Sequence, residues 1–582
     1  MRVVVVTPPP FVLASPAAAP SVLTAVLRER GHEAMCFDAS RFCVDALLTP
    51  KHVGEAGHLG GQLLPGVAAG LALAMPEVVA TMESMSTYAS LDRYDPARAA
   101  IEEALGVLAS AHGATRWTSV QFHGDHDRAD PDSLFAAVRR GREVFDRVLP
   151  EAMRVIASFE PGLVAISVSF PEQLYGALRI GNLVRTQLAD TKVVMGGAST
   201  TRVRASLTQL PELFDFVDFL QLREGELPLA ALADALAARR DPLDLVPGLY
   251  ARRVGMVVAS TTPARGTFPL GQMPVPIFDD LSPGPYLSPQ PLLPVSTTRN
   301  CYFDRCTFCA ISRSFNDGFR MMPADRMLSQ AHTLRARHPG AIFKDVSEAI
   351  PPAAIFKYAE MAAATGDPPP FEAYLRLEPP FAVPDAGQRL FAGGLRTVYF
   401  GLESASANVL QQMRKEINID VAQMALRRFA DAGIWCHLFL IAGHPGETEA
   451  DHEMSLHFLR RNRSWIHSIQ AQPFGLAVDS DLASTTEQYA MKVRERSPTT
   501  LSFDLEISDW GRAPGPEVAR RRARDLRRLA YSEADDTLSR SRLLWDAHRV
   551  VFVEVGGKLA VPGTSDLSHR SPSWIEPTAE AT

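Results

Sequence analysis

The sequence predicts an α/β protein with a doubly wound parallel sheet, a second parallel unit and a smaller helical C-terminal region. Three observations predict this fold class. Short apolar strands alternate with helical patterns in two blocks, a Pro-rich stretch divides the blocks, and 582 residues exceed what one hydrophobic core usually serves. Alternation of strands and helices favours parallel pairing, because each helix returns the chain to the edge where the next strand starts.

The first block begins at the valines of "VVVVT", which predict a buried strand because the apolar run is too short for a signal peptide. A helical pattern over "SVLTAVLRER" ends at Gly31, and further strands are predicted at "PGLVAISVSF", "TKVVMGG" and "FDFVDFLQLREGE". Ligands of doubly wound sheets bind beyond the carboxyl ends of the strands. The candidates for such a crevice are Pro8, Pro9, Ser167, Ser169, Gly196, Gly197 and Glu224. Turn geometry is the alternative for each glycine.

Residues 45–150 interrupt this alternation with Ala-rich and Leu-rich stretches, which predict a helical insertion within a first domain of residues 1–262. The insertion contains "HGDHD", from His123 to Asp127, which has the composition of a metal cluster. Its residues lack the spacing of ligands on one helix, so we favour a solvated loop.

Proline separates the two blocks. A small hairpin is predicted around "DPLDLVPGLYARR", and residues 263–290 predict an extended linker because proline removes ladder donors. Six strand and helix units follow within residues 291–480 and favour a partial parallel barrel. Residues 481–582 predict a mainly helical region, with an amphipathic Arg-rich helix exposed to solvent rather than a polyanion site. The tail after Pro562 is predicted to be disordered.

Functional residues of parallel barrels lie where strands end and loops begin. The strand ends of the second block carry Cys301 to Cys309, Asp345 with Glu348, Arg376, Glu403 with Ser404, and Gly443 with His444. The composition of the chain limits the classes of function that these residues can have. The formal net charge of −7 gives no reason to favour nucleic acid, and no apolar run reaches the roughly 18 residues that a membrane-spanning helix needs. We therefore expect a cytoplasmic protein that binds neither nucleic acid nor membrane.

Three of the six cysteines lie in "CYFDRCTFC", with the spacing C-x4-C-x2-C. In a reducing compartment, such thiols are more often metal ligands than disulfides. Structural zinc requires four ligands, and only a chance contact of the fold would bring His332 or Cys436 into place. A cubane cluster held by three thiolates leaves one iron open for a small chelating molecule. The scattered Cys36, Cys43 and Cys436 are predicted to be buried as small hydrophobic residues.

The cysteine segment resembles the loop of radical S-adenosylmethionine (SAM) enzymes, C-x3-C-x2-C, in which Phe308 takes the place of the aromatic residue before the third cysteine. The segments "IFKDVSEAIPP", "YLRLEPP", "VYFGLESASANVLQQMRK" and "HLFLIAGHPGETEAD" resemble the later strand ends of that superfamily, in order. The segments "VAISVSFPEQ" and "VVMGGAST" resemble the cobalamin-binding domain of one subgroup. Two departures are the fourth residue between the first two cysteines and the absence of D-x-H-x-x-G, which elsewhere supplies a lower axial histidine to cobalamin.

The resemblance implies a Rossmann-like cobalamin-binding domain followed by a partial (β/α)6 radical SAM barrel. It implies that Cys301, Cys306 and Cys309 ligate a [4Fe-4S] cluster whose fourth iron binds SAM. The residues that would contact SAM are Phe308, Asp345, Glu348, Arg376, Glu403 and Ser404, and the strand-end residues of the first domain would line cobalamin. Simpler explanations are an ion pair for Glu403 and Arg376, packing for Phe308, and a capped turn for "GHPGET".

The function implied is a cobalamin-dependent radical SAM C-methyltransferase that acts on an unactivated carbon of a natural product. A ribosomally made precursor peptide is the expected substrate, with a small molecule as the second choice. The expected partner is an external electron donor of the flavodoxin or ferredoxin type. The alternatives are a radical SAM enzyme that cyclises or epimerises without methylation, a zinc-stabilised binding protein, and a tRNA methylthiolase, although no basic C-terminal domain is evident.

Overall fold

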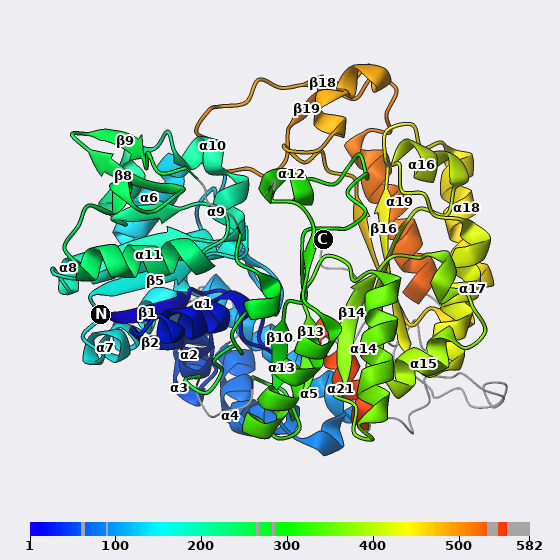
Figure 1. Cartoon of the computed structure of the whole chain (residues 1–582), viewed down its shortest axis with the longest axis horizontal. Coiled ribbons are helices and arrows are strands. Elements are labelled where there is room, and N and C mark those ends of the chain that lie inside the picture. The colour runs from blue at the N-terminus through cyan, green and yellow to red at the C-terminus, as the bar shows by residue number, and fades with distance from the viewer. Residues whose placement is uncertain are drawn as a thin grey trace. The chain divides into compact units, whose positions relative to one another are not determined.

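The computed structural model describes residues 1–59, 65–88, 91–263, 267–281, 286–315, 317–531 and 545–555. These residues form two compact units (Figure 1), each built around one large sheet. The first unit contains Met1–Thr87, Asp92–Pro294 and Arg496–Phe503, and the second contains Tyr88–Leu91, Val295–Glu495 and the described residues from Asp504 on. The predicted α/β class is confirmed. The predicted disordered tail lies outside the described residues.

The first unit contains a seven-stranded sheet in the order β2-β1-β5-β6-β7-β8-β9. Its strands are β1 (Arg2–Thr7), β2 (Glu33–Asp38), β5 (Leu163–Ser167), β6 (Lys192–Gly196), β7 (Phe219–Gln221), β8 (Leu249–Arg253) and β9 (Met256–Ala259). The first five pair in parallel, and the predicted hairpin continues the sheet as antiparallel β8 and β9. Val3 to Val6 are all 0% exposed because helices cover both faces of a doubly wound sheet.

Helices connect these strands and build the inserted region. Those that alternate with the strands are α1 (Ala18–Glu29), α8 (Leu174–Gln187), α9 (Ala198–Arg202), α10 (Arg204–Leu207) and α11 (Glu226–Ala237). Those between β2 and β5 are α2 (Ala39–Leu47), α3 (Pro50–Leu59), α4 (Pro65–Met82), α5 (Leu91–Ser110), α6 (Pro131–Arg140) and α7 (Leu149–Ser158), with the short pair β3 (Arg116–Trp117) and β4 (Phe122–His123). None of the helices in the described ranges has the length and apolar character of a membrane span.

In the "HGDHD" segment, His123, Asp125 and Asp127 are exposed, as expected of a solvated loop, but His126 turns inward. The side chain of His126 is 6% exposed, and its Nδ1 lies 2.9 Å from Oε1 of Glu143, which is itself buried. His126 also stacks on Tyr175 beside a cavity of about 220 Å³. Sequence reasoning missed this contact because Glu143, the partner of His126, comes from a later segment of the chain. Asp125 completes a group whose possible ligand atoms lie within 4.8 Å of one another, but Asp125 already faces Arg140.

The second unit contains a six-stranded sheet whose neighbours follow chain order, as in an open parallel barrel. Its strands are β10 (Leu292–Val295), β13 (Ile342–Asp345), β14 (Phe371–Leu375), β15 (Leu395–Glu403), β16 (Trp435–Ala442) and β17 (Ser468–Pro473). Its helices are α12 (Ile311–Phe315), α13 (Ala324–Arg337), α14 (Pro352–Ala364), α15 (Ala386–Ala392), α16 (Ala407–Gln412), α17 (Ile419–Asp431) and α18 (Glu449–Arg461). Helices α13, α14, α15 and α17 pack in succession along the sheet (Figure 1).

The remaining elements of this unit are short pairs and the C-terminal helices. They are β11 (Thr298–Arg299), β12 (Arg320–Met321), β18 (Lys492–Val493), β19 (Ile507–Asp509), α19 (Pro516–Tyr531) and α21 (Arg549–Val555). The predicted Arg-rich helix is α19, which packs on β16 and β17. Most of its arginines are exposed as expected, but Arg522 is 4% exposed and binds Glu447. Helix α21 packs on β15 and β16, where Arg549 donates a hydrogen bond to His437.

Glu372 on β14 is a buried carboxyl group inside the second unit. It is 2% exposed, accepts a hydrogen bond of 3.1 Å from Tyr399 Oη, and lies 4.0 Å from Lys344 Nζ. Burial raises the pKa of Glu372 to about 7, although the charge of Lys344 and the Tyr399 hydroxyl oppose this shift. The folded protein therefore keeps this proton over a pH range in which the unfolded chain has lost it.

We expect stability to fall as pH rises between the unfolded pKa of Glu372, 4.5, and its folded value of about 7. Below pH 4.5, Glu372 is protonated in both the folded and the unfolded state, and no stability is lost. Above about pH 7, the loss of stability is complete. This loss of folding stability is at most roughly 3 kcal/mol, since one pKa unit corresponds to about 1.4 kcal/mol. Thermal unfolding of Glu372→Gln at about pH 5 and about pH 8 should show a smaller change than the wild type.

The control is Glu360→Gln, because Glu360 on α14 is 60% exposed in its side chain and pairs with Arg389 at the surface. This variant should keep the pH profile of the wild type. An equal profile for the Glu372 variant would show that the carboxyl is ionised in the folded state.

Candidate functional site

The loop that carries the three cysteines follows the first strand of the open barrel. Two of its residues, Asn300 and Asp304, have positive φ angles of 61° and 47°, a conformation that Asn and Asp tolerate better than most residues. Asp304 is one of the four residues between Cys301 and Cys306. The loop thus accommodates the additional residue between Cys301 and Cys306 with a left-handed backbone conformation at Asp304.

Thr307, between the second and third cysteines, anchors this loop on both sides. Its backbone N–H donates to Met413 O at 3.0 Å, and its hydroxyl donates to Gln412 O at 3.1 Å. Its own carbonyl accepts from Leu482 N at 2.9 Å. These bonds connect the cysteine loop to the end of α16 and to the segment after β17.

Two of the three thiols have altered pKa values. Burial raises the pKa of Cys306, and the charges of Lys415 and Arg376 lower it only in part. Burial also raises the pKa of Cys309, to about 11, against a hydrogen bond from the Ile311 backbone. Metals bind the thiolate, so a soft metal bound here would displace these protons. The scattered cysteines are buried, as predicted: Cys36, Cys43 and Cys436 are 2%, 0% and 0% exposed.

Arg376 lies just beyond β14, where the sequence predicted it, and is 5% exposed. Its guanidinium carbon lies 3.4 Å from the ring centroid of Phe303, a residue of the cysteine loop. The guanidinium also donates to Glu378 Oε1 at 3.1 Å and to the carbonyl of Lys415 at 2.8 Å. Sequence reasoning missed Phe303, although its place between two cysteines was a signal. Contact of Arg376 with SAM stays a prediction.

Glu403 ends β15 with a positive φ of 66°, directly after a register shift in the pairing of β15 with β16. Its Oε1 lies 3.0 Å from Nζ of Lys415, and both residues are buried. The sequence suggested an ion pair with an arginine on a neighbouring strand, but the partner is a lysine from the turn after α16. Lys415 was not predicted. Its presence in the quoted segment "VLQQMRK" was the available signal.

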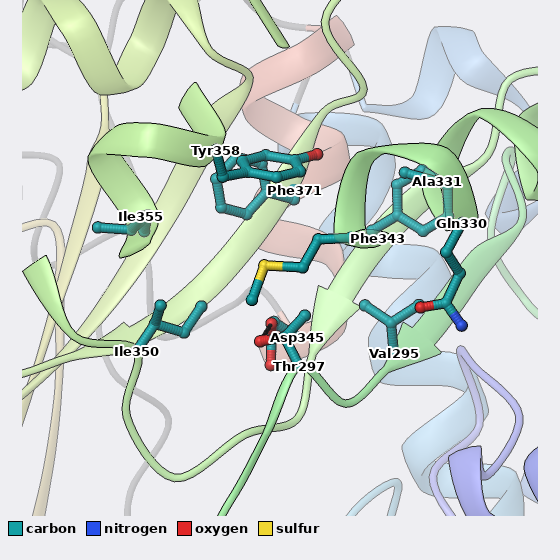
Figure 2. Close-up of a pocket in the computed structure, with 11 residues that line it drawn as sticks. Val295, Thr297, Gln330, Ala331, Phe343, Asp345, Ile350, Ile355, Tyr358 and Phe371 are labelled. Carbon is teal, nitrogen blue, oxygen red and sulfur yellow. Dashed lines mark hydrogen bonds between the residues drawn. The ribbon is translucent and has the colours of Figure 1, made fainter. Parts of the chain in front are cut away.

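Asp345 lies at the end of β13 and is 3% exposed. Figure 2 shows its carboxyl group beside Thr297 at a small, mostly apolar cavity of about 40 Å³. The Thr297 hydroxyl and the Ser347 N–H (2.8 Å) donate to it, so Asp345 connects β13 to the segment after β10. Burial raises its pKa. Glu348 is exposed, and its charge contributes to the raised pKa of Cys309. Roles of both residues in SAM binding stay predictions.

The "GHPGET" turn has the capped structure that was one of its two predicted explanations. Thr448 caps α18 by accepting from Asp451 N at 3.2 Å. Glu447 accepts from Gly443 N at 2.6 Å and from Arg522 at 2.9 Å, and Gly443 has a φ of 81°. His444 is 0% exposed between aromatic rings, and burial lowers its pKa to about 4. It is therefore neutral at physiological pH.

Ser404 and Phe308, which were also predicted to contact SAM, pack against other residues of the second unit. Ser404 is 1% exposed, and its hydroxyl accepts from Ser406 N at 3.1 Å, a bond that belongs to the turn before α16. The ring centroid of Phe308 lies 5.6 Å from Lys415 Nζ, and Phe308 packs on a cluster that includes Phe474. Phe308 therefore packs as one prediction had it, beside the buried ion pair.

The residues predicted to line a crevice of the first unit lie at one edge of its sheet, because β1, β5, β6 and β7 run in parallel. Gln173 bridges this edge by donating to the Pro8 carbonyl at 2.8 Å and accepting from Ser169 N at 2.9 Å. Gly197 has a φ of 121°, and a Cβ there would lie 2.4 Å from the Val168 carbonyl. Turn geometry therefore explains this glycine without a ligand.

The other predicted lining residues share the same strand ends. Ser167 and Gly196 close β5 and β6, Pro9 follows β1, and Glu224 follows β7. A Cβ at Gly196 would lie 2.9 Å from the carbonyl of Gln221, which again reflects close packing of the chain on itself. Contact of these residues with cobalamin stays a prediction.

Fold and site together define an α/β protein whose second unit is an open parallel barrel with a three-cysteine loop after its first strand. Residues 295–459 match the family model of the Radical SAM superfamily. This part of the chain is a radical SAM domain, and the resemblance inferred from the sequence is confirmed.

Individual proteins extend the comparison beyond this domain. An uncharacterised methyltransferase of Pyrococcus horikoshii is 25% identical over 321 residues, which cover 54% of this chain and 68% of that protein. The structure of the radical SAM methyltransferase TsrM from Kitasatospora setae, with cobalamin and a [4Fe-4S] cluster bound, has a TM-score of 0.54 at 14% identity. It covers 94% of this chain and 89% of TsrM.

The cobalamin-dependent radical SAM enzyme OxsB, with aqua-cobalamin and SAM bound, also has a TM-score of 0.54, at 12% identity. This match covers 90% of this chain and 65% of OxsB. At such identities the likeness concerns the fold, and it confirms the predicted succession of a doubly wound domain and a partial barrel.

Proposed function

We propose that this chain is a cobalamin-dependent radical SAM C-methyltransferase with a natural-product substrate. The observation that carries the proposal is the trio Cys301, Cys306 and Cys309 on the loop that opens a radical SAM barrel. The fold of TsrM, a methyltransferase whose structure holds cobalamin and a [4Fe-4S] cluster, extends over 94% of the chain and supports the assignment.

The donor set suits an iron-sulfur cluster with one open iron. Three thiols lie on one loop, and soft thiolate ligands favour such clusters. Lys415 and Arg376 place positive charge beside Cys306, which offsets part of the burial that favours its thiol. Cys301, Cys306 and Cys309 would hold the cluster, and the open iron would take SAM. When bound, these groups supply reductive cleavage of the sulfonium, and cobalamin carries the methyl group.

The side chains around the loop would bind and orient SAM and would exclude water from it. Arg376 is fixed by Phe303, Glu378 and the Lys415 carbonyl, which leaves part of its fork, including Nη1, to donate to a carboxylate ligand. Glu403 offers acceptor oxygens for ribose hydroxyls while Lys415 holds its carboxylate in place. His444, which is neutral, is buried against the rings of Phe474 and Tyr489, so the packing after β16 is apolar. Such exclusion of water protects reactive species.

Cobalamin would bind at the carboxyl edge of the first sheet, where doubly wound folds take their ligands. The donor set at that edge consists of short polar side chains and backbone groups, which suits contacts with amide side chains of a corrin. Without D-x-H-x-x-G, we assign no lower axial histidine.

A small molecule is the substrate class that we favour. One TsrM structure holds its tryptophan substrate and a SAM analogue, with a TM-score of 0.51 and 85% coverage of this chain. The precursor peptide expected from the sequence is the second candidate. The expected electron donor is a flavodoxin or a ferredoxin, because cleavage of SAM consumes one electron from outside the chain.

The test is anaerobic incubation of the purified, iron-loaded chain with SAM, cobalamin, a reductant and candidate substrates. We expect a product heavier by one methyl group, together with S-adenosylhomocysteine and 5′-deoxyadenosine, detected by mass spectrometry. Deoxyadenosine without a methylated product would instead favour cyclisation or epimerisation. A colourless, zinc-containing protein would reject the radical assignment.

A further inference from the structure

Lys415 is a buried cation at the cysteine loop. It is 7% exposed, and lysine is rarely buried unless it is paired. Its Nζ lies 3.0 Å from Oε1 of Glu403, and its backbone carbonyl accepts from Arg376 at 2.8 Å. Its two neighbours, Arg414 and Glu416, both have positive φ angles, of 50° and 54°. This turn is therefore held in an unusual backbone conformation, with the ammonium group directed inward.

Gly401 shows how closely this ion pair packs on β15. A Cβ at Gly401 would lie 2.7 Å from Oε1 of Glu403 and 2.9 Å from Nζ of Lys415. Real Cβ atoms essentially never approach so closely, so any larger residue would displace the pair. The strand leaves room for an ammonium–carboxylate pair at this point and for no further side chain.

The turn and the cysteine loop form one connected structure. Thr307, which lies between Cys306 and Cys309, is hydrogen-bonded to Gln412 and Met413, which lie three and two residues before Lys415. The ring of Phe308 lies 5.6 Å from Nζ. The position of the ammonium relative to these cysteines is therefore set by hydrogen bonds rather than by a free side chain.

The ammonium of Lys415 lies beside the cysteine loop, 5.6 Å from the ring centroid of Phe308, and its charge partner is Glu403 at 3.0 Å. Burial lowers the pKa of Lys415, but Glu403 and then Cys306 raise it, with a net upward shift that keeps the ammonium charged.

We infer that Lys415 raises the reduction potential of the cluster that Cys301, Cys306 and Cys309 would hold. The inference rests on the proposed function. The step concerned is the uptake of one electron by the oxidised cluster from an external donor, without transfer of a proton or a bond change. The reduced cluster carries one more negative charge, so a nearby buried cation stabilises it more than the oxidised cluster. Lys415 thereby makes the electron easier to supply.

The test is a potentiometric titration of the iron-loaded protein without SAM, with the reduced cluster followed by electron paramagnetic resonance. Lys415→Met should lower the equilibrium constant for reduction at least tenfold, which corresponds to about 59 mV for one electron. Lys415→Arg keeps the charge and should stay within about threefold of the wild type. Lys357→Met removes an exposed lysine of α14 and should change nothing.

Iron and sulfide contents separate a change in potential from a failure to fold. If Lys415→Met loads no cluster, the double variant Lys415→Met with Glu403→Gln leaves no buried unpaired charge, and its potential should still fall. The inference would be overturned if either variant that lacks the Lys415 charge held a full iron-sulfur cluster and kept the wild-type potential. Loss of iron from both charge-removing variants would also overturn it, because Lys415 would then be needed for the loop itself. A wild-type chain without a [4Fe-4S] cluster would reject the proposed function instead.

Discussion

Replacement of Cys306 by alanine should abolish the formation of 5′-deoxyadenosine from SAM. A cluster with only Cys301 and Cys309 as protein ligands would lose one of its three anchors, and the loop would offer no thiol in its place. Reductive cleavage would then lack both the electron and the iron that binds SAM. The measurement is the amount of deoxyadenosine formed per chain under reducing, oxygen-free conditions, together with the iron content.

The matched control is Cys436→Ala in β16, since Cys436 is buried in the same unit but away from the loop sequence. It should keep its iron and form deoxyadenosine at the wild-type rate. Binding of cobalamin to the Cys306→Ala protein, followed by its absorption spectrum, should not change, because the proposed crevice belongs to the first unit. Normal deoxyadenosine formation by Cys306→Ala would disprove the role of this cysteine.

Replacement of Arg522 by methionine should destabilise the second unit by about 3–5 kcal/mol, the usual cost of removing one partner of a buried ion pair. The side chains of Arg522 and Glu447 are 5% and 2% exposed, and their charged atoms lie 2.9 Å apart. Methionine would fill much of the volume but would leave the Glu447 carboxylate buried without its cation. Chemical unfolding followed by tryptophan fluorescence measures the difference.

The control variant is Arg520→Met, two residues earlier on the same helix, where the side chain is exposed. It should change stability by less than about 0.5 kcal/mol, as is usual for surface substitutions. If both variants unfold alike, Glu447 is stabilised by the Gly443 backbone alone. The same experiment examines the "GHPGET" turn, since Glu447 holds Gly443 and Arg522 together.

Several elements of the fold could be predicted because their cause is local. Four consecutive valines produced a strand buried on both faces, and the separation of short apolar runs by helical patterns produced two parallel sheets. Thr448 in front of a helical segment produced an N-cap. The three cysteines were equally visible, because ligands on one loop need no folded partner to be recognised.

Other features could not be predicted, because they depend on partners that meet only in the folded chain. The charge partner of Glu403 is Lys415, although an arginine on a neighbouring strand was the expected one. His126 was assigned to a solvated loop, yet it lies buried against Glu143.

Sequence by itself determined the α/β class, the order of the two parallel units and the presence of a loop with three clustered thiols. These depend on composition and spacing within short segments, where backbone geometry follows directly from residue type. Tertiary structure alone decided which charges are buried beside those thiols, namely Lys415 with Glu403 and Arg376 against Phe303. Such pairings are set by the path of the chain between distant segments, because a buried charge is stable only where the fold brings it a partner.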